Sequence, residues 1–197
     1  MEKKHYFNTK MIATTGILVG IEILFQIIGN YINPGFANIN LSLIPIVIGA
    51  VLYGPVVGGF LGLVCGVMVI ISPSTMQIFF SASPVGTILA CILKTTVAGV
   101  AAGLVVKLFK GEKKIYGVIL ASILVPVINT ALFSIFALIF FMPLLQSMIS
   151  ETMPNIAAAL FVGMIGINFI LEVISTVILA PSLYKILEHA GINKKDL

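Results

Sequence analysis

The chain has 197 residues, of which 59% are hydrophobic and 9% are charged, and its mean hydropathy is +1.18. Soluble domains carry about 25% charged residues, so this composition excludes a water-soluble globule and indicates an integral membrane protein. All eleven basic residues are lysines, and the positions of all but Lys94 follow membrane topology, so the net charge of +4 gives no indication of nucleic-acid binding. We expect one domain over residues 1–197, without room for a separate catalytic or nucleotide-binding domain.

The first half of the chain predicts three apolar helices. The first is long enough to cross a bilayer, which needs about 20 apolar residues, whereas the second is short for a full crossing. Glu22 and Gln26 interrupt the first apolar run and no small-residue cleavage site follows closely, so we expect a retained helix rather than a signal peptide. The turn residues 33–35 and Gly54-Pro55 separate the helices, and a polar stretch over 72–83 predicts a loop. The expected helices cover residues 10–31, 41–53 and 55–71.

The second half predicts three further helices, separated by polar segments. A charged turn over 110–114 separates the fourth helix from the fifth, and a polar stretch over 143–156 predicts a loop between the fifth and the sixth. Pro126 lies inside the fifth helix, which we expect it to kink. The expected helices cover residues 84–108, 115–142 and 156–187.

The distribution of lysines predicts how these helices cross the membrane. With six crossings, three lysine groups fall on one side, and the loops on the other side hold none; these groups are Lys3, Lys4 and Lys10, then Lys107, Lys110, Lys113 and Lys114, then Lys185, Lys194 and Lys195. Lysine-rich segments stay in the cytoplasm, so both termini are expected there. Tyrosines near the predicted helix ends suit the membrane interface. The sequence therefore predicts an all-α membrane protein, a bundle of six transmembrane helices with cytoplasmic termini.

Three ionisable residues interrupt the apolar helices: Glu22, Lys94 and Glu172. A charge inside the bilayer costs several kcal/mol, so such residues usually face a partner or a cavity. By the helical rise, Lys94 lies about 15 Å from the outer end of its helix, and Glu172 lies at a comparable depth. Lys94 and Glu172 are therefore expected either to neutralise each other or to meet a polar ligand.

Uncharged polar residues extend this candidate site. Asn168 lies four residues before Glu172 and so shares its helix face, while Asn129 lies near the middle of the fifth helix. These amides either bond between helices or contact a ligand, and the polar loop residues are either solvated or held over the ligand. The candidate binding residues are Asn38, Asn40, Gln77, Lys94, Asn129, Asn168 and Glu172.

Small residues at four-residue spacing predict close helix packing. Gly58, Gly62 and Gly66 follow this spacing in the third helix, where backbones are expected to approach a neighbour. On the first helix, small residues at spacings of three and four either pack within the bundle or offer a flat strip for docking to another membrane subunit. This candidate docking strip consists of Ala13, Gly16 and Gly20.

The sequence lacks the motifs of several classes of function. A phosphate-binding Walker loop, expected in a self-powered pump, is absent from the sequence. The two histidines, His5 and His189, lie near the termini, and Cys65 and Cys91 fall inside apolar runs as expected for buried thiols. Neither an enzyme, nor a metal site, nor a cofactor is therefore expected.

The stretch over 40–59 resembles a known family of membrane proteins. Its Leu52-Tyr53-Gly54-Pro55 segment, followed by Gly58 and Gly62, resembles the helix 2–3 region of the substrate-binding S components of energy-coupling factor (ECF) transporters. The resemblance implies a vitamin-binding protein of the bacterial cell membrane. It would dock on a membrane coupling subunit that two cytoplasmic ATPases power. Its site would lie near the outer face, built by loops 1 and 3 and helices 4 to 6.

The substrate class follows from the polar residues. A lone ammonium at Lys94 suits a carboxylate or phosphate, and with the neighbouring amides it favours a small hydroxylated acid such as pantothenate. The absence of tryptophan disfavours a large flat ligand. Two other classes stay open: a stand-alone proton-coupled secondary transporter that uses Glu22, Lys94 or Glu172, and a membrane assembly protein without a ligand.

Overall fold

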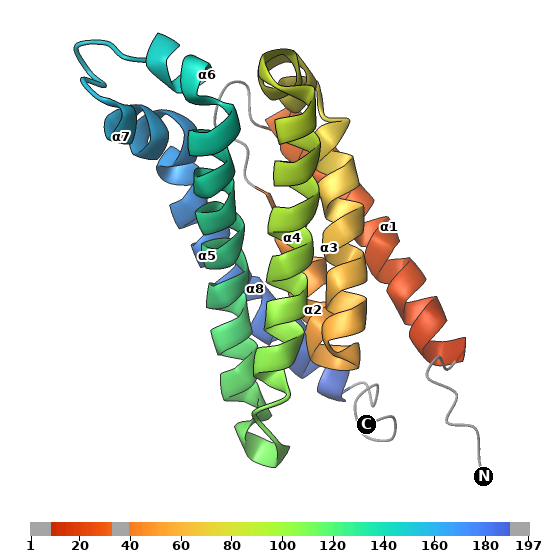
Figure 1. Cartoon of the computed structure of the whole chain (residues 1–197). Coiled ribbons are helices and arrows are strands. Elements are labelled where there is room, and N and C mark those ends of the chain that lie inside the picture. Colours follow the sequence, from red (N-terminus) through yellow and green to blue (C-terminus); the bar gives the residue numbers. More distant parts are fainter. Residues whose placement is uncertain (1–8, 33–39, 190–197) are drawn as a thin grey trace.

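The computed structural model describes residues 9–32 and 40–189, which fold into a bundle of helices (Figure 1). Four helices are long and apolar enough to cross a membrane, by length and composition: α1 (Thr9–Ile32), α4 (Pro84–Val106), α5 (Lys114–Phe140) and α8 (Gly166–His189) with the short helical turns before it. Two shorter apolar helices, α2 (Leu43–Tyr53) and α3 (Pro55–Ile70), complete the bundle. The predicted all-α membrane class is confirmed.

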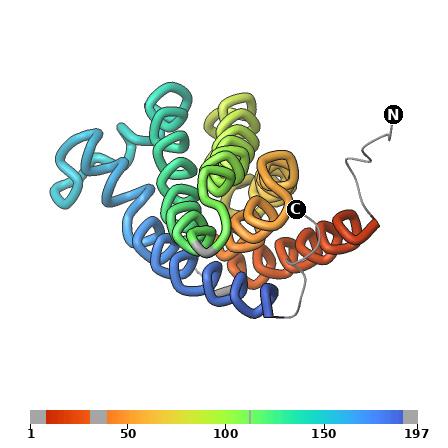
Figure 2. Tube along the Cα trace, turned by 90° about the horizontal axis from the view of Figure 1, so that it is seen from below, coloured from red at the N-terminus to blue at the C-terminus, as the bar shows by residue number. Residues whose placement is uncertain are grey.

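The short helix α2 forms the centre of the bundle. Residues 43–52 are all buried, and α2 contacts α1, α3, α4, α5 and α8. A helix that is apolar on every side is stable only where neighbours surround it. In the view along the bundle, α3, α4 and α5 follow one side, and α1 and α8 follow the other (Figure 2).

The glycines of α3 allow this helix to pack backbone to backbone against α4. A Cβ atom at Gly62 would overlap the Thr95 carbonyl, and one at Gly58 would overlap the carbonyl of Gly99. The predicted role of these glycines in close packing is confirmed. Gly54, with φ 84°, ends α2 in a conformation that favours glycine, and Pro55 then begins α3.

The polar stretch that predicts a loop over 72–83 is mostly helical instead. It contains the π-helical turn η1 (Thr75–Phe80), and Thr75 within it is buried. The Ser72 hydroxyl lies within hydrogen-bond distance, 2.8 Å, of both the Thr75 hydroxyl and the Val69 carbonyl oxygen. These bonds satisfy polar groups that the sequence alone assigns to solvent.

The segment between α5 and α8 also differs from the prediction. The loop expected over 143–156 contains the six-residue helix α6 (Met142–Ser147). The single helix expected over 156–187 is interrupted: a short α7 (Ile156–Ala158) and a π-helical η3 (Ala159–Ile165) precede α8. Gly166 makes the break with a φ of 45°, which glycine adopts without a steric penalty.

The described lysines other than Lys94 gather at one end of the bundle. They lie at the beginning of α1, around the turn η2 (Gly111–Lys113) and near the end of α8; these lysines are Lys10, Lys107, Lys110, Lys113, Lys114 and Lys185. In Figure 1 these helix ends lie together, and η1, α6 and α7 lie at the opposite end. The terminal lysines and Tyr6 lie outside the described residues.

Candidate functional site

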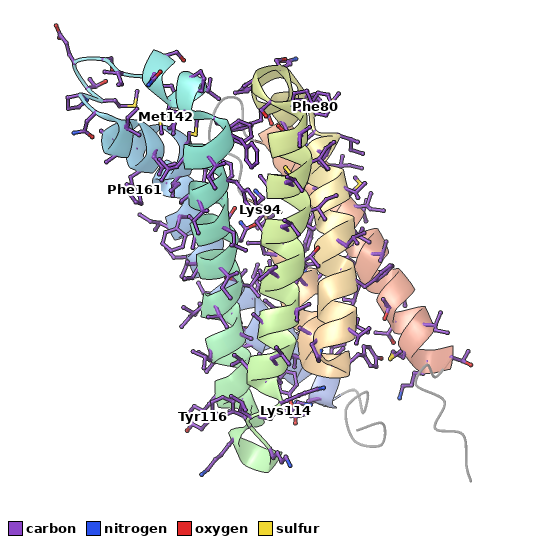
Figure 3. The ribbon with its side chains drawn as sticks, in the orientation of Figure 1. Phe80, Lys94, Lys114, Tyr116, Met142 and Phe161 are labelled. Carbon is purple, nitrogen blue, oxygen red and sulfur yellow. The ribbon has the colours of Figure 1, made fainter. Side chains whose placement is uncertain are left out.

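A cavity of about 520 Å³ lies between the helices. Its walls come from α1, α3, η1, α4, α5, α6, η3 and α8, together with Asn40 before α2. Figure 3 shows Lys94, one of the lining residues, between α4 and α5, nearer to Phe80 and Met142 than to Lys114 and Tyr116. The cavity therefore occupies the part of the bundle away from the lysine-rich end.

Most of the predicted binding residues line this cavity. They lie in five separate segments of the chain; these residues are Asn40, Gln77, Lys94, Asn129, Asn168 and Glu172. Asn38, the remaining member of the predicted set, lies outside the described residues. The fold thus brings together side chains up to 132 positions apart (172 − 40). That they bind a ligand stays a prediction.

The Lys94 ammonium lies over an aromatic ring. Its Nζ atom is 5.0 Å from the centroid of the Phe133 ring, an arrangement that favours a cation over the face of the ring. Within the described part of the chain, Lys94 and Glu172 attract each other electrostatically but are not close enough to form a salt bridge. That these two residues neutralise each other, rather than meet a ligand, stays a prediction.

Glu172 is a nearly buried side chain at the wall of the cavity, with 7% of its surface exposed. The backbone of Asn40 and the side chain of Asn129 interact electrostatically with its carboxyl group. Both belong to other segments of the chain than α8. Glu172 therefore has polar neighbours from two other segments at the wall of the cavity.

Several lining residues were not predicted from the sequence. Gln26 and Asn30 of α1, Thr130 of α5 and Ser147 of α6 also line the cavity. The four-residue spacing of Glu22, Gln26 and Asn30 places them on one helix face and is a signal that could have revealed the two residues of α1. Ser147 gave no such signal, since its segment was interpreted as a loop.

An aromatic cluster lines the side of the cavity near η1. The Phe79 ring packs edge-on against Phe133, with centroids 5.7 Å apart, and against Phe141 at 5.2 Å. Phe79 and Phe133 line the cavity, as do Phe169, Met148 and Met164. The cavity therefore has an apolar wall beside its amides and charges, as ligand sites usually do.

Glu22 lies on α1, one turn before the residues of this helix that line the cavity, and does not line the cavity itself. It is completely buried, and neither carboxylate oxygen has a hydrogen-bond partner among the described residues. The Ser42 hydroxyl contacts the Glu22 backbone carbonyl at 3.2 Å and Gln26 Oε1 at 3.0 Å. The polar face of α1 thus packs toward α2 rather than toward lipid.

The candidate docking strip lies on the surface of the bundle. Ala13, Gly16 and Gly20 are exposed, and a Cβ atom at either glycine would meet no described atom within 4 Å. Exposed Ile17 and Leu24 lie beside them on α1. The strip is therefore not used to pack α1 against the described helices of this chain.

The helices and the polar cavity between them define an integral membrane protein with room for a small solute. A comparison with protein-family models matches residues 10–184 to the family described as ECF transporter, substrate-specific component. The match covers most of the chain, so the protein belongs to this family, whose members are transporter components rather than enzymes. Neither the comparison with curated proteins nor the comparison with solved structures finds a match.

Proposed function

We propose that this S component captures a vitamin-like micronutrient, with pantothenate as the leading candidate, for ATP-driven uptake. The observation that carries the proposal is the convergence of Lys94 with amide side chains from five other segments around one cavity. The volume of about 520 Å³ falls within the range of about 300–1,000 Å³ that is typical of small-molecule sites.

The substrate follows from the chemistry of the lining residues. Lys94 supplies the positive charge that a carboxylate needs, and its cation–π contact with Phe133 leaves ammonium hydrogens to donate. Asn129, Thr130 and Asn168 line the same cavity and match ligand hydroxyl and amide groups. Pantothenate carries a carboxylate, hydroxyls and an amide, and so fits this set. Asn38, two positions before Asn40 in the sequence, is also proposed to belong to the site.

The proposed topology has six crossings in a single domain over 1–197. The lysine-rich end of the bundle would face the cytoplasm, with both termini, because positive loops are retained there. The cavity would then open toward the outside of a bacterial cell membrane, where the substrate is encountered.

Energy for uptake would come from other subunits. The sequence has no phosphate-binding Walker loop, so ATP would be hydrolysed by two cytoplasmic ATPases that act through a membrane coupling subunit. The docking strip of Ala13, Gly16 and Gly20 is proposed as the surface that meets this coupling subunit, because small residues allow close approach of helices.

The test is mass spectrometry of the small molecules released from the purified, detergent-solubilised protein, followed by isothermal titration with pantothenate. A stoichiometric bound micronutrient is the expected result. Uptake into proteoliposomes of this chain alone, without ATP, would instead identify a secondary transporter. A protein that releases and binds no small molecule would contradict substrate capture.

A further inference from the structure

The two charges in the cavity wall do not form a closed pair. Among the described residues that line the cavity, Lys94 and Glu172 are the ionisable ones, and no salt bridge joins them. The Lys94 ammonium instead faces the Phe133 ring at 5.0 Å. A ring face attracts a cation but accepts no strong hydrogen bond, so the ammonium keeps its capacity for an anion.

The Glu172 carboxylate likewise keeps acceptor capacity. A carboxylate offers about four lone-pair positions, and the Asn40 backbone and the Asn129 side chain, both from outside α8, are polar neighbours of this one. Glu172 lines the cavity. Its acceptor positions are therefore within reach of donors on a molecule that fills the cavity.

These two observations restrict the functional groups of the ligand more strongly than the presence of Lys94 alone does. A ligand with only an anionic group would satisfy Lys94 but would bury a second negative charge near Glu172 and leave its acceptors unpaired. Sites built to accept a hydrogen bond discriminate strongly against analogues that lack the donor, because the buried acceptor then has no partner. A ligand with both an acidic group and a donor group leaves neither charge without a partner.

We propose that the ligand is bifunctional, with an anionic group held by Lys94 and a hydroxyl or ammonium group held by Glu172, and that Glu172 selects the donor. This inference rests on the proposed substrate-binding function and adds the requirement for the second group. The apolar wall that contains Phe79 and Phe133 contacts the part of the ligand that joins the two polar ends.

The first test is the chemical class of the molecule that mass spectrometry finds in the purified protein. A molecule with an acidic group and a hydroxyl or amine supports the inference. A bound molecule that lacks either group overturns the inference and leaves substrate capture intact. The absence of any bound molecule, with no binding of added pantothenate, overturns the proposed function and this inference together.

The second test measures pantothenate affinity by isothermal titration in the Glu172→Gln and Glu172→Leu variants. Glu188→Gln is the matched control, because Glu188 is an exposed residue at the far end of the same helix. Glutamine retains one acceptor oxygen, so a hydroxyl donor predicts a loss of about 10-fold for Glu172→Gln and about 100-fold for Glu172→Leu. An ammonium-bearing ligand predicts a loss of about 100-fold or more already with glutamine, because the paired charge is gone.

Matched analogues separate the two ends of the ligand. The alcohol analogue of pantothenate lacks the acid, and an analogue without hydroxyl groups lacks the donors; both are expected to bind the unmodified protein at least 10-fold more weakly. In Glu172→Leu, removal of the hydroxyls should cause little further loss, since their partner is absent. Thermal unfolding without ligand establishes that each variant is folded. Equal affinities of the Glu172 variants and Glu188→Gln would overturn the inference.

Discussion

At the scale of single residues, position in the fold rather than residue type separates the three intramembrane ionisable groups. Lys94 and Glu172 line the cavity, whereas Glu22 is buried beside α2. Glu172 has polar neighbours from two other segments, and Lys94 lies over an aromatic ring. The Glu22 carboxylate oxygens, in contrast, have no hydrogen-bond partner among the described residues. Lys94 and Glu172 are therefore the two groups whose charge the proposed site can use.

The Lys94→Met variant is expected to fold and to lose pantothenate affinity. Removal of the ammonium leaves the ligand carboxylate buried without its counter-charge, which costs about 3–5 kcal/mol, or a few hundred-fold or more in affinity. Isothermal titration checks this, with Lys185→Met as the control because Lys185 is exposed near the end of α8. An unchanged affinity in folded Lys94→Met protein would remove this residue from the site.

The double variant Lys94→Met with Glu172→Gln tests whether the two charges serve each other. Because they form no salt bridge among the described residues, we expect the double variant to fold but to bind no better than Lys94→Met. Isothermal titration measures ligand binding by both variants, and thermal unfolding establishes that both are folded. Recovery of ligand binding in the double variant would show that the two charges form a structural pair.

At the scale of helices, glycines have two different roles. In α3 they admit the α4 backbone, because a Cβ atom at Gly62 would overlap the Thr95 carbonyl. On α1, Gly16 and Gly20 face open space instead. The same four-residue spacing therefore marks an internal contact in one helix and an available surface in another, which the spacing alone does not distinguish.

The Gly62→Ala substitution is expected to destabilise the bundle, and Gly20→Ala is not. Forcing a methyl group against the α4 backbone costs about 1–3 kcal/mol, as overpacking generally does, whereas the methyl group at Gly20 meets no described atom within 4 Å. Thermal unfolding of the two variants in detergent compares them directly. Equal melting temperatures would contradict the close α3–α4 contact.

The substitutions Gly16→Leu and Gly20→Leu are expected to block uptake and to leave ligand binding intact. Bulky side chains on the docking strip would hold the coupling subunit away from α1, and neither glycine lines the cavity. Uptake by the complete transporter and titration of the isolated chain measure the two properties separately. Val56→Leu, a change at an exposed position of α3, serves as the control. Normal uptake in both glycine variants would exclude the strip as the docking surface.

At the scale of the whole molecule, the bundle has two chemically different ends. Apart from Lys94, the described lysines lie at the end that contains η2, and the cavity lies in the part away from it. This asymmetry is the one that the proposed topology requires, with the lysine-rich end in the cytoplasm.

Labelling of single cysteines tests the orientation. In a background with Cys65→Ala and Cys91→Ala, a probe at Lys110 should be protected from a membrane-impermeant thiol reagent in intact cells, and one at Ser150 should react. Both positions are exposed at opposite ends of the bundle. Reaction at Lys110 with protection at Ser150 would reverse the proposed topology.

The sequence by itself determined the membrane class, the approximate positions of the main apolar helices and the ionisable residues that interrupt them. These properties follow from local composition, since a long apolar segment in a bilayer satisfies its backbone groups by forming a helix. The helix boundary at Gly54-Pro55 and the close packing of the α3 glycines could also be predicted, because turn chemistry and small-residue spacing act over a few neighbouring residues.

Only the tertiary structure decided how these elements meet. The helical course of 72–83, the break at Gly166 and the contact of Lys94 with Phe133 depend on partners far along the chain, which no local pattern specifies. Gln26 and Phe133 became cavity residues because α1 and α5 turn those faces inward. The composition of a segment indicates that it forms a helix in an apolar environment. Packing against the other helices determines which polar side chains share a cavity.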